Sequence, residues 1–144
     1  MKKNLIFGLM TGVIIFASCT KQSATAPPPP AVISDNDTSA SNLVYTGIFS
    51  GVGGESVTGS SDIYNNDGKN TLVLNNFSAS AGPDLHVYLS QESTPIHFID
   101  LGKLRANSGT QVYEIVGMPD FSLYTFVLIH CQQYNHVFGV SALK

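Results

Sequence analysis

The stretch Tyr124-Thr-Phe-Val-Leu-Ile-His-Cys-Gln-Gln133 is the longest apolar run outside the N-terminal segment. In a strand, alternate side chains point to opposite faces. One face would then carry Tyr124, Phe126, Leu128 and His130, and the other Thr125, Val127, Ile129 and Cys131. Apolar side chains on both faces are typical of a central strand that is covered on both sides. The run therefore predicts the strand around which a β-sheet core is built.

The segments around this run are short, alternate in polarity and are separated by turn signals. Asn65-Asn-Asp-Gly68 predicts a tight hairpin turn between strands at 61–64 and 70–74. In the segment 85–90, Leu85, Val87 and Leu89 would face inward while His86 and Tyr88 point away from them. Residues 98–104 are expected to be irregular, and residues 119–123 to form a single helical turn. Because no segment keeps a helical period, the sequence predicts an all-β fold, a single antiparallel β-sandwich of about seven or eight strands.

Length and charge limit the function classes. A chain of 144 residues with 43% hydrophobic and 12% charged residues has material for one domain with a real core. The net charge is −3, and removal of Lys2 and Lys3 with a cleaved leader would leave five Lys and Arg against ten Asp and Glu. This acidic balance argues against a nucleic-acid partner.

The N-terminal segment has the three parts of a secretory signal: Lys2 and Lys3, an apolar run, and small residues before Cys19. Phe16-Ala-Ser-Cys19 resembles a bacterial lipobox, in which the cysteine is lipidated and becomes the new N-terminus. Because Thr20 follows, rather than the Asp that retains lipoproteins at the inner membrane, we expect an outer-membrane lipoprotein if the source is Gram-negative.

We expect three parts in the chain. Residues 1–18 would be a lipoprotein signal peptide, residues 19–42 the lipidated Cys19 and a flexible tether rich in Pro, Ser and Thr, and residues 43–144 the folded domain. A tether of this composition spans on the order of 25 Å.

The folded part resembles a known family, the DM-thirteen or electron-transfer domain of that name, which occurs in bacterial lipoproteins and in animal Skeletor-like proteins. The resemblance covers nearly all of residues 45–143 and rests on an ordered set of motifs. They are Gly47-Ile-Phe49, Val57-Thr-Gly59, Leu72-Val-Leu-Asn-Asn-Phe77, Gly82-Pro-Asp-Leu-His-Val-Tyr-Leu-Ser90, Asp100-Leu-Gly-Lys-Leu104, Gly109-Thr-Gln-Val-Tyr113, Val127-Leu-Ile-His-Cys131 and Val137-Phe-Gly-Val-Ser-Ala-Leu143. The resemblance implies a β-sandwich with a signature cysteine, here Cys131, that acts in redox chemistry as a bare thiol or a cofactor ligand. The family often has Trp before that cysteine, where this chain has His130.

Cys131 has two interpretations from its own surroundings. On a strand face with Val127 and Ile129 it is most simply a small buried hydrophobe, whose thiol stays protonated and unreactive. Its place near the strand end, beside Gln132, favours the opposite interpretation of a partly exposed redox thiol. If Cys19 is lipidated, no second cysteine of the chain is left to pair with Cys131.

Two cofactor hypotheses involve Cys131. The spacing from Cys131 to His136 is similar to that of the ligand loop of blue-copper proteins, and His86 is a candidate for the second imidazole, which makes a cupredoxin-like copper carrier an alternative function. No Met follows His136, however, and Met118 precedes the loop. For haem, the chain has no Cys-x-x-Cys-His attachment motif. The expectation is no cofactor, or else haem or copper at Cys131.

Enzyme activity is not favoured, because the acidic residues are scattered among turns, and we name no catalytic residue. The principal hypothesis is a redox or electron-transfer module that meets the membrane through its lipid anchor and works with an unidentified redox or protein partner. A further alternative is a surface binding module for glycan or protein in which the cysteine is purely structural.

Overall fold

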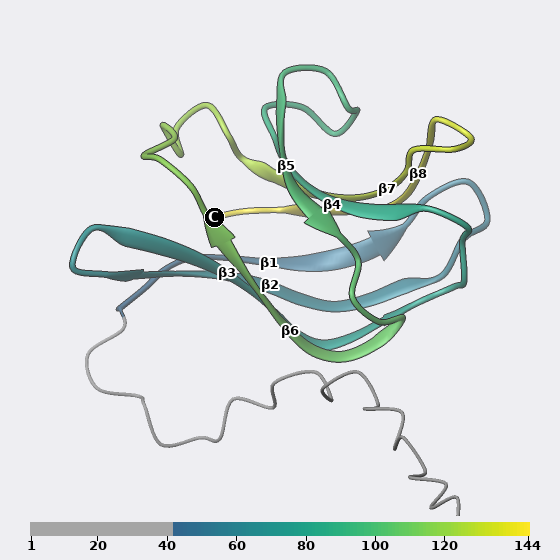
Figure 1. Cartoon of the computed structure of the whole chain (residues 1–144), viewed down its shortest axis with the longest axis horizontal. Helices are drawn as coiled ribbons and strands as arrows, with labels where there is room; N and C mark the ends of the chain where they lie inside the picture. The colour runs from purple at the N-terminus through teal and green to yellow at the C-terminus, as the bar shows by residue number, and fades with distance from the viewer. Residues whose placement is uncertain (1–41) are drawn as a thin grey trace, which may run out of the picture. The chain divides into compact units, whose positions relative to one another are not determined.

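The computed structural model describes residues 42–144, and the regular elements within that range are all strands (Figure 1). They are β1 (Asn42–Gly51), β2 (Val57–Asn66), β3 (Lys69–Ala79), β4 (Leu85–Ser90), β5 (Phe98–Lys103), β6 (Ser108–Ile115), β7 (Phe126–Cys131) and β8 (His136–Ala142). Across residues 42–144 there is no helix with the length and hydropathy needed to cross a membrane. The expected signal peptide, Cys19 and most of the expected tether lie outside the described residues.

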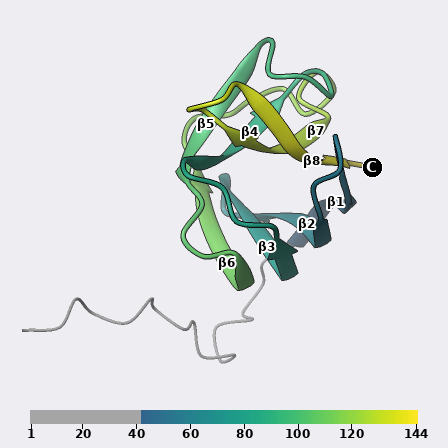
Figure 2. The ribbon, with the colours of Figure 1, turned by 90° about the vertical axis from the view of Figure 1, so that its right-hand side faces the viewer.

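The eight strands form one antiparallel sheet in the order β5-β4-β7-β8-β1-β2-β3-β6. The sheet curls over until its edge strands β5 and β6 come into contact, so that β5, β4, β7 and β8 make one layer and β1, β2, β3 and β6 the other (Figure 2). β1 belongs to both layers, because its first part pairs with β2 and residues 49–51 pair with β8. The all-β sandwich prediction is confirmed, with the two layers joined into a nearly closed barrel.

The central strand is β7, which lies between β4 and β8. Its inner side chains Val127, Ile129 and Cys131 belong to the hydrophobic core. On the outer side, Leu128 and His130 are also buried. The predicted two-sided cover is therefore confirmed, although the strand is shorter than the run that predicted it.

Both predicted turns are present. Asn66 pairs with Lys69, which leaves Asp67 and Gly68 as a two-residue hairpin loop, and both have positive φ. This is the backbone that Asp-Gly sequences favour, because φ > 0 costs Gly nothing and Asp little. The helical turn after Pro119 is closed by Asp120, whose carbonyl oxygen accepts from the amides at positions 123 and 124, each at 2.9 Å.

The expectation of an irregular segment at residues 98–104 was wrong, because residues 98–103 form the edge strand β5 paired with β4. The Asp100-Leu-Gly102 sequence looks like a turn, but it lies at a bulge where the register shifts between Val87 and Tyr88. Gly102 adopts φ +113°, and Asp100 accepts a hydrogen bond from its amide at 2.8 Å. The turn chemistry is therefore absorbed into an irregular strand edge.

Candidate functional site

Cys131 is the last residue of β7, on the inner face of the sheet, and it is a free cysteine. Its cross-strand neighbours are Leu85 in β4 and His136 in β8. The exposed fraction of Cys131 is 0%. A small reagent in solvent therefore reaches the sulfur only when this end of the sandwich opens.

His136 covers the same end of the sandwich. Direct partners in an antiparallel pair share one face with Cβ atoms about 4.5–5.5 Å apart, so the side chains of His136 and Cys131 start from neighbouring positions on the same face. The ring is half-buried and lies edge-on to Phe138, with the two ring centroids 5.5 Å apart. It also lies against Gly53, where an added Cβ would meet His136 Cε1 at 2.7 Å. Cys131 and His136 are thus cross-strand partners at the end of the sandwich where the loop with Gly53 and Gly54, both of positive φ, approaches the His136 ring.

His86 lies on the other face of the sheet. It is the cross-strand partner of His130, whereas Cys131 is the partner of Leu85, so the His86 and Cys131 side chains point to opposite faces. His86 Nδ1 donates to both carboxylate oxygens of Asp100, at 3.2 and 3.0 Å. The structure therefore brings Cys131 and His136 together but does not bring His86 to them.

The candidate copper ligands thus do not form a set. Across residues 42–144 no group of three His, Cys, Asp or Glu side chains is arranged to hold a metal ion. Met118, the nearest Met in sequence before the loop, lines a hollow that does not include Cys131. A haem at Cys131 would need a wide apolar pocket beside the sulfur, and this residue is instead enclosed by core side chains. The surroundings of Cys131 fit neither group.

A stack of rings on the outer face was not predicted. Phe98 stacks on Tyr88 with ring centroids 4.1 Å apart, and Tyr88 stacks on His130 at 5.1 Å. Tyr88 OH accepts a hydrogen bond from Gln132 Nε2 at 2.8 Å, and burial raises the pKa of its phenol. The sequence signal was that His86 and Tyr88 in β4 share a face with Leu128 and His130 in β7, but that pattern alone gave no sign of the stacking.

His130 stands out within this stack, because it is 4% exposed and neither ring nitrogen has a hydrogen-bond partner among the described residues. Burial lowers the pKa of its imidazole. The outer face of β7 therefore contains a histidine whose burial favours the neutral form.

Two carboxylates lie near the stack: Asp84, just before β4, and Asp100 in β5. Lys103 Nζ lies 2.9 Å from Asp84 Oδ1, and His86 Nε2 lies 3.6 Å from the same oxygen. The hydrogen bond from Lys103 is the main reason why the pKa of the Asp84 carboxyl is lowered. These groups pair with one another at the surface.

The comparisons with known proteins identify the family. No curated protein and no solved structure matches the chain. The family model described as Electron transfer DM13 matches residues 50–143, which is more than half of the chain and includes Cys131, His136 and the ring stack. The chain belongs to the Electron transfer DM13 family.

Proposed function

We propose that this protein is a lipid-anchored, extracytoplasmic redox module whose reactive atom is Cys131 Sγ. Family membership supports electron transfer as the general role. The observation that carries the proposal is the cross-strand pairing of Cys131 with His136 at one end of the sandwich. This pairing sets an imidazole beside the one cysteine of the folded domain.

In this role, access of a partner protein to the Cys131 thiol depends on an opening motion at this end of the sandwich. When the end of the sandwich opens, His136 accepts the proton of Cys131, and the thiolate attacks the sulfur–sulfur bond of a partner protein's disulfide. A mixed disulfide forms, and the partner's second sulfur leaves as a thiolate that takes up a proton. Two thiols of a second partner protein complete the exchange: the first displaces the reduced partner from the mixed disulfide, and the second displaces Cys131 as a thiol, so that the second partner is left as the disulfide. The gate consists of the His136 ring and the loop at Gly53 and Gly54, where an added Cβ at Gly54 would meet nothing within 4 Å.

The test is alkylation of the purified protein by iodoacetamide without denaturant, with Cys131→Ala as the blank. We expect labelling of Cys131 at a rate that rises with pH, because the thiolate is the reactive form. His136→Ala is expected to speed the labelling, since it removes the ring that covers this end. Labelling only after unfolding would sink the redox proposal.

A control separates local opening from global unfolding. Ile63 is fully buried on β2, in the other layer, so Ile63→Val should lower the free energy of unfolding by about 0.5–1.5 kcal/mol without touching the gate. If opening is local, this variant labels at the wild-type rate. A labelling rate that increases in step with the lost stability would show that Cys131 is reached only through global unfolding.

The complete burial of Cys131 favours a second candidate function, a binding module in which the cysteine is structural. On this alternative, Cys131→Ala would leave the biological activity unchanged while lowering stability. The first function requires that the same substitution abolish activity in cells even where the protein is still folded.

The lipid anchor is a separate part of the proposal and rests on the signal-like segment that ends in Phe16-Ala-Ser-Cys19. Cys19→Ala is expected to release the protein from the membrane fraction, outer membrane if the source is Gram-negative, while the domain stays folded. Membrane fractionation before and after the substitution checks this. Unchanged fractionation would rule out lipidation at Cys19 and leave the Cys131 chemistry untouched.

A further inference from the structure

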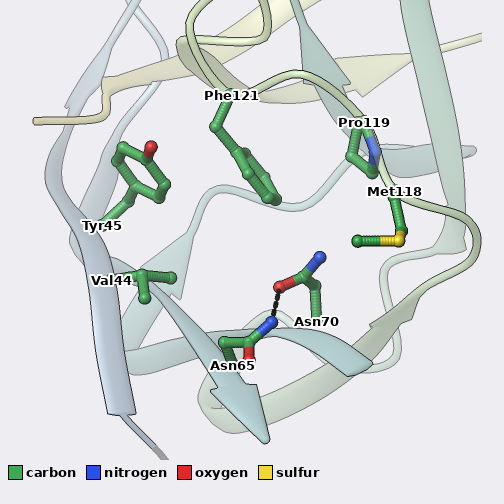
Figure 3. Close-up of a pocket in the computed structure, with 7 residues that line it drawn as sticks. All are labelled: Val44, Tyr45, Asn65, Asn70, Met118, Pro119 and Phe121. Atoms are coloured by element: carbon green, nitrogen blue, oxygen red, sulfur yellow. Dashed lines mark hydrogen bonds between the residues drawn. The ribbon is translucent and has the colours of Figure 1, made fainter. Parts of the chain in front are cut away.

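A hollow of about 480 Å³ opens at the end of the sandwich away from Cys131 (Figure 3). Three segments far apart in the sequence form it: the start of β1, the β2–β3 hairpin and the connection from β6 to β7. Its lining residues are Val44, Tyr45, Asn65, Asn70, Met118, Pro119 and Phe121. The volume is in the range of about 300–1,000 Å³ that small-molecule sites occupy.

The walls of the hollow are apolar and partly unpacked. The rings of Tyr45 and Phe121 lie against each other with centroids 5.0 Å apart. Across from them, Met118 is 81% exposed although it borders this hollow. A flexible thioether on the rim can close over an apolar ligand, since Met adapts its shape at low cost.

The floor of the hollow holds an amide with one free end. Asn65 Nδ2 donates to Asn70 Oδ1 at 2.7 Å, and Asn65 Oδ1 accepts from the Gly68 amide at 3.3 Å. These two bonds fix which way both amides point. Asn70 Nδ2 is therefore directed into the hollow, toward the space below Phe121 (Figure 3).

This amide nitrogen has no partner within residues 42–144, although the Asn70 residue is only 5% exposed. The nitrogen is not one of the fully enclosed unpaired atoms of residues 42–144, so it faces the open space of the hollow, where the acceptor of a ligand would take the place of water. The hollow thus offers the Asn70 amide as a directional donor within a lining that also contains Tyr45, Asn65 and four apolar side chains.

The residues that line the hollow also favour an uncharged ligand. None of the seven lining residues is charged, so an ionic ligand would lose its hydration without gaining a counter-charge. A sugar would bring several hydroxyl groups to a site with one free amide and few other polar atoms. We propose that the hollow is a binding site for a neutral, largely apolar ring compound that carries a carbonyl oxygen, with the ring against Tyr45 and Phe121 and the oxygen on Asn70 Nδ2.

The test uses four small probes on the purified ¹⁵N-labelled protein. Acetophenone has the ring and the carbonyl, ethylbenzene has the ring alone, benzoate adds a charge, and a methyl glucoside represents a glycan. We expect acetophenone to shift the side-chain NH₂ signals of Asn70 and to bind roughly threefold to tenfold more tightly than ethylbenzene, the contribution of one net hydrogen bond. Benzoate and the glucoside are expected to bind more weakly than acetophenone.

Two variants test whether the probes bind in this hollow and not elsewhere on the protein. Asn70→Asp keeps the shape and removes the donor, so it should abolish the preference for acetophenone over ethylbenzene. Met118→Ala does not touch the core, and it should weaken both ring probes equally because it removes part of the rim. If Asn70→Asp does not fold, the NH₂ signals of the wild type and the Met118→Ala titration still decide the question.

Several results would overturn the proposal: no shift at Asn70 with acetophenone, equal affinity for acetophenone and ethylbenzene, or tighter binding of the glucoside, which would indicate a glycan site instead. Neither Cys131 nor the lipid anchor enters this test, so its failure leaves the redox proposal as it was.

Discussion

The two ends of the sandwich differ in how they are closed. At one end, the turn of residues 132–135 and the loop at Gly53 bring His136 over Cys131 and leave the thiol without exposure. At the other end, the β2–β3 hairpin and the connection from β6 to β7 remain apart and leave a hollow with an exposed Met118 on its rim. One sheet thus encloses a side chain completely at one end and leaves an open hollow at the other.

The largest contrast is expected from the same substitution made at each end. Leu85→Ala removes a buried side chain next to Cys131 and should lower the free energy of unfolding by about 2–5 kcal/mol. Leu123→Ala, on the exposed turn beside the hollow, should change it by less than about 0.5 kcal/mol. Urea unfolding of both variants measures this, and equal losses would show that the closed end is no better packed than the open one.

The next effect concerns the thiol itself. Cys131→Ser puts a hydroxyl where the core has a sulfur, and in a dry apolar site it should cost about 1–3 kcal/mol. Cys131→Ala should destabilise mainly through a small cavity. Thermal and urea unfolding of the two variants give the values. A Ser variant as stable as the wild type would mean that water reaches position 131, and the closed end would then have to be regarded as open.

The sequence predicted the closed end better than the open one. Alternation in the run 124–133 predicted that Cys131 shares the inner face with Val127 and Ile129, because strand periodicity depends only on local geometry. The Asp67-Gly68 turn was predictable for the same reason, since its backbone requirement is local.

The remaining features depend on contacts between distant segments. Nothing near Val44 in the sequence indicates that Asn70 and Phe121 will line the same hollow. Similarly, the lack of partners for His130 follows from its stacking under Tyr88, which only the packed structure determines. The β5 strand was missed because Asp100 and Gly102 carry turn chemistry within an edge strand.

Stability measured as a function of pH tests the burial of His130 on the outer face of β7. Burial lowers the pKa of His130 in the folded protein, while in the unfolded chain the imidazole titrates near 6.5. Below this pH the unfolded state binds the proton first. Stability is therefore complete above pH 6.5 and decreases as the pH falls toward the folded-state pKa, with a smaller change than the core substitutions cause.

The variant His130→Phe tests whether His130 causes this decrease of stability with falling pH. The ring can still stack on Tyr88, while the titrating nitrogens are removed. Urea midpoints measured from about pH 7.5 down to about pH 5 should then depend less on pH in the variant. If the urea midpoint of the variant depends on pH as strongly as that of the wild type, a group other than His130 causes the dependence.

The smallest effect is expected at the rim of the hollow. Met118→Ala should leave the free energy of unfolding within about 0.5 kcal/mol of the wild type, because an 81% exposed side chain contributes little to the core. Calorimetric melting provides the measurement. A substantial loss would indicate that Met118 packs into the hollow in solution, so that both ends would be closed.

The bond pattern of β1 has a mechanical consequence. Thr46 exchanges two backbone hydrogen bonds with Lys144, at 3.2 and 2.9 Å, beside the pairing of β1 with β8. The chain thus enters and leaves the domain at the same end of adjacent antiparallel strands, and a force that separates residue 42 from residue 144 acts across these strands. The hydrogen bonds then break one pair after another rather than together. A domain held by its two ends would therefore come apart along β1 first, because forced unfolding is governed by the rate of the first separation and not by the total stability.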